Sequence, residues 1–167
     1  MQIKILFVIG DTGSAHYCIP LWEKWKKEKK YSWKILTLDF VTKFLNLNEF
    51  SEHLIKDFHS TSSVEEKISS LGWEPNLIFS SASFKDIEVK SMIYAKQRNI
   101  RGAQFFDTWY NYYKRLVKQN NKVLADKVCL IDKLAYNDAI SEGVNKNKLV
   151  VIGQPYLERI KLKRKFI

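Results

Sequence analysis

The sequence predicts an α/β protein with a doubly wound, mainly parallel Rossmann-like sheet of about six strands, arranged in three αβα layers. Short apolar runs alternate along the chain with segments of helical periodicity. The first run, Ile3 to Ile9, is almost continuously apolar, which is typical of a strand buried on both faces. Gly72 and Gly143 follow helical segments, at positions where helices commonly end. This alternation predicts βαβ units with right-handed crossovers.

The expected elements follow in chain order. Strands are expected at 3–9, 33–40, 77–81, 102–106, 127–131 and 149–152. Helices are expected at 14–30, 63–71, 86–99, 109–118, 133–142 and 156–161, and 41–62 should hold a short helix and a long loop. Pro20 predicts a kink in the first helix or a start nearer Ile19. In the helix at 86–99, Val89, Met92 and Ile93 are expected to face inward.

Length and composition indicate one folded domain. The chain has 167 residues, of which 46% are hydrophobic and 14% aromatic, so it is too apolar for a disordered protein. Its apolar runs are far shorter than the roughly 20 residues that span a bilayer, and the N-terminus lacks signal-peptide features. We expect a cytoplasmic domain at 1–155, followed at 156–167 by a basic tail or a linker to a second domain that is missing here.

The cysteines and histidines indicate no metal or redox centre. Cys18 and Cys129 have no metal-binding or redox spacing, so buried free thiols are expected. His53 and His59 are expected at the surface. We therefore predict no metal and no cofactor.

The net charge of +10 permits a nucleic-acid, membrane or phosphorylated partner without selecting one. The densest basic run, Lys24 to Lys30, is expected to be the solvated end of a helix. No nucleic-acid recognition motif is present, so we expect no nucleic-acid partner. Peripheral contact with the inner membrane face through "PLWEKWKKEKK" is an alternative, although core packing of both tryptophans is favoured.

In sheets of this type, ligands bind beyond the carboxyl ends of the strands. The loop after the first strand contains Gly10 and Gly13, which let a backbone approach a ligand, and Ser14. Asp11 and His16 add candidate acid–base groups. The loop matches neither the dinucleotide fingerprint nor the P-loop, and it equally fits a tight turn with Ser14 as N-cap.

Two further loops carry small polar groups. After the third strand, Ser83 is placed to contact a ligand or to cap the next helix. After the last strand, Gln154 lies in a Gly-Gln-Pro turn, from which it could reach a ligand or simply close the turn.

The stretch "FFDTWYNYYKRL" combines aromatic and charged residues at the end of the fourth expected strand. Asp107 directly follows this strand and so lies at the ligand edge. If the next residues are helical, Asn111 and Arg115 share one face, while Trp109 shares another with nearby tyrosines. The alternative is an aromatic core helix capped by Asp107.

Four segments, taken in order, resemble the N-terminal domain of GT-B-fold glycosyltransferases and the related UDP-GlcNAc 2-epimerases. They are "IKILFVIGDTGS", "GWEPNLIFSSAS", "FFDTWYNYYKRL" and "ADKVCLIDKLAYNDAISEGVNKNKLVVIGQP". In the second segment, Asn76 stands where the family usually has an acid. The resemblance ends where such an enzyme would begin its second Rossmann domain, which supplies most contacts to the nucleotide sugar.

The resemblance implies a domain that binds a sugar or lipid-linked acceptor through 10–16, 107–115 and Gln154. Asp11, His16 and Asp107 are then candidates for the base that removes a proton from the acceptor hydroxyl. Arg115 would hold a phosphate or carboxylate of the acceptor. A second domain or a partner subunit would be needed for activity.

Two other functions fit the same residues. One is a non-enzymatic Rossmann-like module that binds a nucleotide or another anionic ligand. The other is a fragment that resembles a UDP-sugar 2-epimerase.

Overall fold

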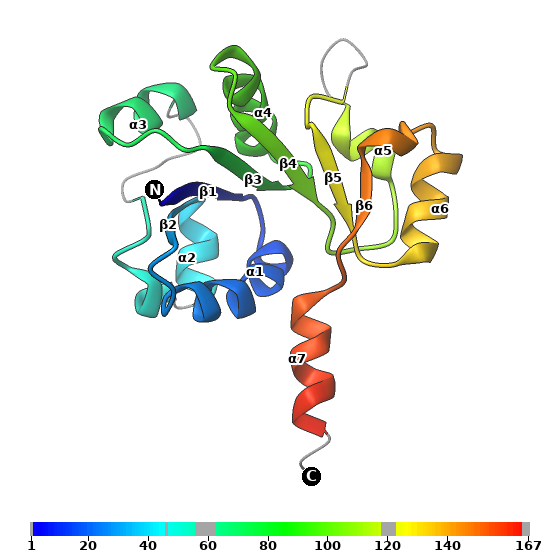
Figure 1. The fold of residues 1–167 in the computed structure, drawn as a ribbon, viewed down its shortest axis with the longest axis horizontal. Coiled ribbons are helices and arrows are strands. Elements are labelled where there is room, and N and C mark those ends of the chain that lie inside the picture. The colour runs from blue at the N-terminus through cyan, green and yellow to red at the C-terminus, as the bar shows by residue number, and fades with distance from the viewer. Residues whose placement is uncertain (1, 46, 56–62, 118–122, 165–167) are drawn as a thin grey trace.

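The computed structural model describes residues 2–45, 47–55, 63–117 and 123–164. A parallel sheet crosses the molecule in the order β2-β1-β3-β4-β5-β6 (Figure 1). Its strands are β1 Ile3–Ile9, β2 Tyr31–Thr37, β3 Leu77–Ser81, β4 Arg101–Phe105, β5 Lys127–Leu130 and β6 Leu149–Val151. From β1 the chain adds β2 on one side and then β3 to β6 on the other, so the strand order switches direction between β1 and β3. The predicted doubly wound α/β fold is therefore confirmed.

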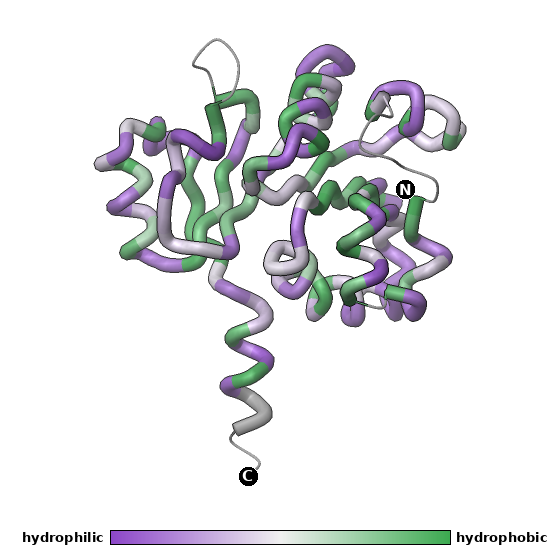
Figure 2. The backbone as a smooth tube through the Cα atoms, turned by 180° about the vertical axis from the view of Figure 1, so that it is seen from behind, coloured by the Kyte–Doolittle hydropathy of each residue, from purple (hydrophilic) through white to green (hydrophobic). Residues whose placement is uncertain are grey.

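Helices cover both faces of the sheet and form the outer layers. The described helices are α1 Thr12–Trp25, α2 Asp39–Leu45, η1 Leu47–Phe50, α3 Val64–Ser70, α4 Asp86–Gln97, α5 Tyr112–Leu116, α6 Lys133–Ser141, η2 Lys146–Lys148 and α7 Pro155–Arg164. The helices α1, α2 and η1 pack in one core, and α3 to α6 pack in the other. Apolar residues concentrate in the strands between them (Figure 2).

The strand β1 supplies both cores. Its residues from Ile5 to Ile9 are buried, with Leu6 and Val8 on one face and Phe7 on the other. The continuous apolar run was thus a correct sign of a strand covered on both sides. Cys18 and Cys129 are buried free thiols, as predicted.

The tryptophans of "PLWEKWKKEKK" belong to an aromatic cluster in the core. Trp22 is fully buried, and its ring centroid lies 5.7 Å from that of Phe7 and 6.3 Å from that of Trp33. Trp25 is partly buried against Phe7 and Tyr31. The favoured core-packing interpretation is confirmed, whereas membrane contact stays a prediction. Among the described residues, no helix has the length and apolarity to cross a membrane.

Several element bounds differ from those expected. Because Asp11 caps α1, this helix begins at Thr12, not at Ser14 or Ile19, and Pro20 lies inside it. The strand β2 ends at Thr37, since Asp39 already opens α2. The expected inward face of α4 was partly wrong. Met92 is buried, but Val89 and Ile93 are only half-buried, because the buried face is displaced toward Glu88 and Ser91.

The helix α7 extends from the body of the protein and packs at its base on α1 (Figure 1). The Tyr17 hydroxyl donates to the Gly153 carbonyl at 3.1 Å, and Arg159 pairs with Glu23 at 2.9 Å. The expected boundary at 155 and 156 falls at the start of this helix, and the linker role of 156–167 stays a prediction. Residues 165–167 and His59 lie outside the described residues.

We predict that Trp22→Ala lowers the free energy of unfolding by about 3–5 kcal/mol, because it removes a fully buried ring from the core between α1 and the sheet. Chemical denaturation measures this change. Lys27→Ala, at an exposed position on the same basic segment, serves as the control and should change stability by less than about 0.5 kcal/mol. Equal small effects of both changes would contradict the assignment of Trp22 to the core.

Candidate functional site

Three loops meet at the carboxyl edge of the sheet, because parallel strands all end on one side. We call this the carboxyl-edge site and define it by Gly10–Asp11, Ser81–Ser83 and Phe106–Thr108, with the first turn of α1. The Gly10 amide donates to the Ser81 hydroxyl at 3.0 Å, which joins the first two loops. A Cβ on Gly13 would lie 2.7 Å from the Asp107 carboxylate, which places the third loop against α1. The predicted Gly10, Asp11, Gly13, Ser83 and Asp107 are thus brought together.

Asp11 is held at the N-terminus of α1. Its Oδ1 accepts a hydrogen bond from the Ser14 amide at 2.8 Å, so Asp11 is the N-cap. The alternative prediction of Ser14 as N-cap was wrong, and Ser14 is instead buried in the first turn. The Asp11 side chain remains partly exposed, so one carboxylate is available at the positive end of the helix.

Asp107 is a second, more deeply buried carboxylate at this edge. Its side chain is 11% exposed, and its Oδ1 lies 3.5 Å from the Arg115 guanidinium. Burial raises the pKa of Asp107, and the negative charge of Asp11 raises it further, while Arg115 opposes both effects. Asp107 is therefore a stronger base than an ordinary aspartate.

Arg115 is the buried cation that pairs with Asp107. Its side chain is 5% exposed, and its guanidinium donates to Asp107 and to the Thr108 hydroxyl. The guanidinium carbon also lies 4.8 Å from the centroid of the Phe106 ring. Because both terminal nitrogens of the guanidinium bond to these neighbours, Arg115 orients Asp107 in this structure, and its direct contact with an acceptor stays a prediction.

The helix that carries Arg115 is shorter than the expected 109–118. It begins at Tyr112, after Asn111 adopts the left-handed region with φ of 56°. Asn111 is exposed and Arg115 is buried, so the expected shared helical face was wrong. Trp109 precedes the helix, is 43% exposed and donates its indole N–H to Asp132 at 2.8 Å. Asp107 caps no helix here, so that alternative is also excluded.

Glu88 is a buried acid of the site that sequence reasoning missed. It lies on α4, is 1% exposed, and its Oε1 accepts hydrogen bonds from the hydroxyls of Ser81 and of Ser83, the latter at 2.7 Å. Burial raises the pKa of Glu88 to about 7, although the two hydroxyls oppose the shift. A helical register with Ile87, Glu88 and Ser91 inward would have revealed it. Ser83 thus binds Glu88 and does not cap α4, contrary to one alternative.

His16 and Gln154 contact α7. The ring centroids of His16 and Tyr156 are 5.3 Å apart, and the Gln154 side-chain oxygen accepts from the Tyr156 amide at 3.0 Å. Gly153 has φ of 89°, as the turn before α7 requires. In the part of the chain that the structure describes, no three His, Cys, Asp or Glu residues are grouped as a metal site.

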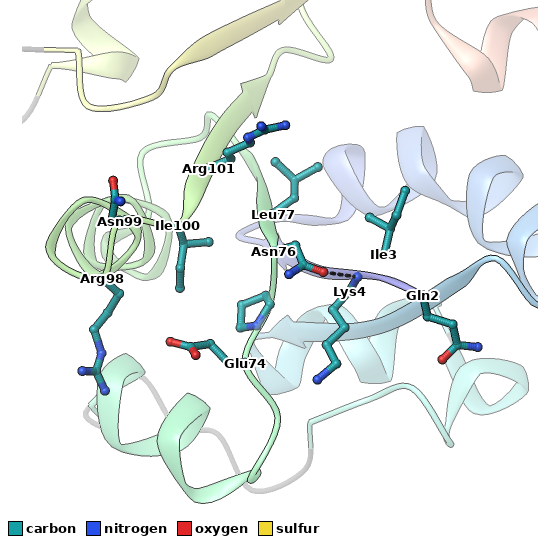
Figure 3. Close-up of a pocket in the computed structure, with 11 residues that line it drawn as sticks. Gln2, Ile3, Lys4, Glu74, Asn76, Leu77, Arg98, Asn99, Ile100 and Arg101 are labelled. Carbon is teal, nitrogen blue, oxygen red and sulfur yellow. Dashed lines mark hydrogen bonds between the residues drawn. The ribbon is translucent and has the colours of Figure 1, made fainter.

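A large open cavity lies at the opposite, amino edge of the sheet (Figure 3). Its volume is about 910 Å³, and its lining includes Lys4, Asn76, Arg98 and Arg101. The Lys4 amide donates to the Asn76 side chain at 2.9 Å, so Asn76 ties β1 to the segment before β3. Arg98 follows the C-terminus of α4, where a cation complements the helix dipole. Asn76 and Arg98 thus have structural roles at this edge.

We expect Arg115→Met to lower the free energy of unfolding by about 3–5 kcal/mol, because it leaves Asp107 buried without its partner charge. The double variant Asp107→Asn, Arg115→Met should recover much of this loss, which denaturation of all three proteins would measure. Lys114→Met, at the exposed neighbouring position, is the control. A double variant that is as unstable as the sum of the single changes would argue against the pair.

Glu88 should make the protein less stable as the pH rises. Its pKa is about 7 in the folded protein and ordinarily 4.5, so the folded state holds the proton more tightly. The stability contribution is complete below about pH 4.5 and is lost as the pH passes through about 7, a change of up to about 3 kcal/mol. Glu88→Gln should remove this dependence in denaturation curves from pH 5 to 9. Glu66→Gln, at an exposed carboxylate on α3, should preserve it.

No protein-family model and no curated protein matches this chain. Solved structures do match it. The UDP-GlcNAc 2-epimerase of Neisseria meningitidis, bound to UDP-GlcNAc, superposes with a TM-score of 0.64 and 19% identity, over 98% of this chain and 52% of that chain. The S. aureus MnaA–UDP structure superposes with a TM-score of 0.71 and 17% identity, over 96% of this chain and 47% of that chain. The UDP-GlcNAc 2-epimerase of Methanocaldococcus jannaschii has a TM-score of 0.64 and 16% identity, over 98% of this chain and 50% of that chain.

These structures show the fold of the chain. At 16–19% identity the likeness extends to the backbone architecture, and the chain spans about half the length of the structures it matches. The resemblance inferred from the four sequence segments is confirmed at this level. The chain therefore has the GT-B-like Rossmann fold that UDP-GlcNAc 2-epimerases contain, over nearly all of its own length.

Proposed function

We propose that this chain is the acceptor-binding half of a GT-B-type glycosyltransferase, which takes a sugar from a nucleotide sugar and needs a second Rossmann-like domain or a partner subunit. The observation that carries the proposal is the pair of carboxylates, Asp11 and Asp107, at the N-terminus of α1 on the carboxyl edge. The length supports it, since the chain spans about half of the enzymes it resembles in fold.

Asp107 is our first candidate for the general base. Its raised pKa favours proton uptake, and Arg115 keeps its carboxylate oriented. The base removes the proton of an acceptor hydroxyl while the hydroxyl oxygen bonds to the anomeric carbon of the donor sugar. The bond from that carbon to the phosphate oxygen breaks, and the nucleoside diphosphate leaves. Asp11 and His16 are further candidates for this base.

Exposed groups near Asp107 are proposed to bind the acceptor. Trp109 offers an apolar ring face and Asn111 an amide, and both side chains are exposed. Gly13 leaves room beside Asp107, since any side chain there would collide with the carboxylate. Contacts to the nucleotide are assigned to the second domain, which 156–167 would join to this one.

A second candidate function is half of a UDP-sugar 2-epimerase. The names of the matching structures favour it, because they are UDP-GlcNAc 2-epimerases. Inverting a carbon of the sugar also requires acid–base groups, which Asp11 and Asp107 can supply.

Binding to the chain alone separates these enzymes from a simple nucleotide-binding module. We expect UDP-GlcNAc to shift the amide NMR signals of Gly10, Gly13 and Asp107, because in either reaction its sugar has to lie beside the base at the carboxyl edge. UDP should shift them much less, because we assign the contacts to the nucleotide to the other domain. Stabilisation by UDP as strong as by UDP-GlcNAc would favour the non-enzymatic module instead. Shifts confined to residues of the amino-edge cavity would contradict the carboxyl-edge site.

The reaction product separates the two enzymes. With a second domain supplied, a transferase releases UDP and attaches the sugar to an acceptor, whereas an epimerase inverts the sugar at C2 and keeps UDP attached. In either case, Asp107→Asn should lower kcat by about 10²–10⁴-fold, because it removes the base. Lys114→Met is the matched control. Full activity of Asp107→Asn would exclude Asp107 as the base.

A further inference from the structure

The carboxyl of Glu88 lies directly beneath the turn between β1 and α1. A Cβ added to Gly10 would lie 2.6 Å from the Ser83 hydroxyl and 2.8 Å from the Glu88 carboxyl carbon. A side chain at residue 10 would collide with these buried groups, so this contact accounts for glycine at this position. The turn that carries Asp11 is packed onto an acid that itself touches no solvent.

A chain of hydrogen bonds joins Glu88 to this turn. The Gly10 amide donates to the Ser81 hydroxyl at 3.0 Å, and the Ser81 hydroxyl donates to Glu88 Oε1. The Ser83 hydroxyl donates to the same oxygen at 2.7 Å. Gly10 precedes Asp11 in the chain. The Ser81 hydroxyl therefore links the protonation state of Glu88 to the backbone next to a proposed site residue.

The Ser81 hydroxyl has two alternative acceptors. It faces Glu88 Oε1, and it also lies 3.4 Å from the Val8 carbonyl oxygen. A hydroxyl carries one hydrogen, so it donates to only one of them at a time. An ionised Glu88 accepts this hydrogen, whereas a protonated Glu88 can supply its own and leave the Ser81 hydrogen for Val8.

The other carboxylate oxygen makes the charged form costly. Glu88 Oε2 is buried and has no hydrogen-bond partner among the described residues. The charged neighbour that acts on Glu88 from the facing turn is Asp11, which carries the same sign of charge. A buried carboxylate with one bare oxygen and a like charge nearby is destabilised relative to its neutral form.

We propose that Glu88 is a positioning residue of the carboxyl-edge site, whose proton, through the Ser81 hydroxyl, holds the Gly10–Asp11 turn in the geometry that binds ligand. The inference rests on the proposed function for its ligand, but the hydrogen-bond relay can be tested without any ligand. The neutral form of Glu88 is the form that binds ligand. Ionisation of Glu88 places a second negative charge near Asp11 and destabilises this geometry of the turn.

The relay is tested by NMR on the whole chain. The amide signal of Gly10 should titrate with a midpoint near pH 7 in the unmodified protein and should not titrate in Glu88→Gln, which keeps an acceptor oxygen but cannot ionise. In the control variant Glu66→Gln, the Gly10 amide signal should titrate as it does in the unmodified protein. A Gly10 signal that is flat in the unmodified protein, or that titrates equally in Glu88→Gln, would overturn the proposal.

The effect on binding is tested by calorimetry with UDP-GlcNAc at pH 6 and pH 8. If only the neutral form binds, the affinity of the unmodified protein should fall about tenfold between these values, because a group with a pKa near 7 is mostly protonated at the first and about a tenth protonated at the second. Glu88→Gln should bind equally at both. Glu88→Asp keeps an ionisable group and should retain a fall in affinity with pH. A fall of equal size in Glu88→Gln would overturn the role in binding.

The two arms separate the inference from the function on which it rests. Absence of UDP-GlcNAc binding in every protein would count against the proposed function, and the Gly10 titration would still decide the relay. Normal binding without any dependence on Glu88 would leave the proposed function standing and reject Glu88 as a positioning residue.

Discussion

The burial of β1 on both faces is the constraint on which the rest of the structure depends. Its apolar residues alternate between two cores, so helices must cover both sides of the strand. Within the sheet β1 lies between β2 and β3, at the point where the order of the strands switches direction. The loop that leaves β1 consequently emerges at the switch point, beside the loops after β3 and β4.

The polar groups of the carboxyl edge are stabilised by one another. Asp107 is compensated by Arg115, and the guanidinium in turn lies over the Phe106 ring. One carboxylate oxygen of Glu88 accepts hydrogen bonds from two hydroxyls, and the other has no hydrogen-bond partner among the described residues. Since burial disfavours a charged carboxylate, the pKa values of Asp107 and Glu88 are raised, and both favour their protonated forms more than ordinary carboxylates do. A site of proton-accepting carboxylates follows from this burial.

The local sequence was sufficient for the fold and for part of the site. Continuous apolar runs identified the strands, and the rule for parallel sheets then placed Asp11 and Asp107 at one edge. Local patterns were less successful where capping or packing decided the outcome. Ser14 looked like a cap, but Asp11 is closer to the helix start and accepts the bond from its amide. A helix was expected at 109–118, but the left-handed conformation of Asn111 delays its start to Tyr112.

The sequence by itself determined the order of strands and helices, the burial of β1 and the polar character of the loops at its carboxyl edge, because these depend on periodicity along the chain. Only the tertiary structure decided which polar groups meet. Arg115 lies under Asp107, and Glu88 lies under Gly10, through contacts between residues remote in sequence or on different elements. Periodicity carries no information about such pairs, since a side chain's partner is set by how the helices pack on the sheet.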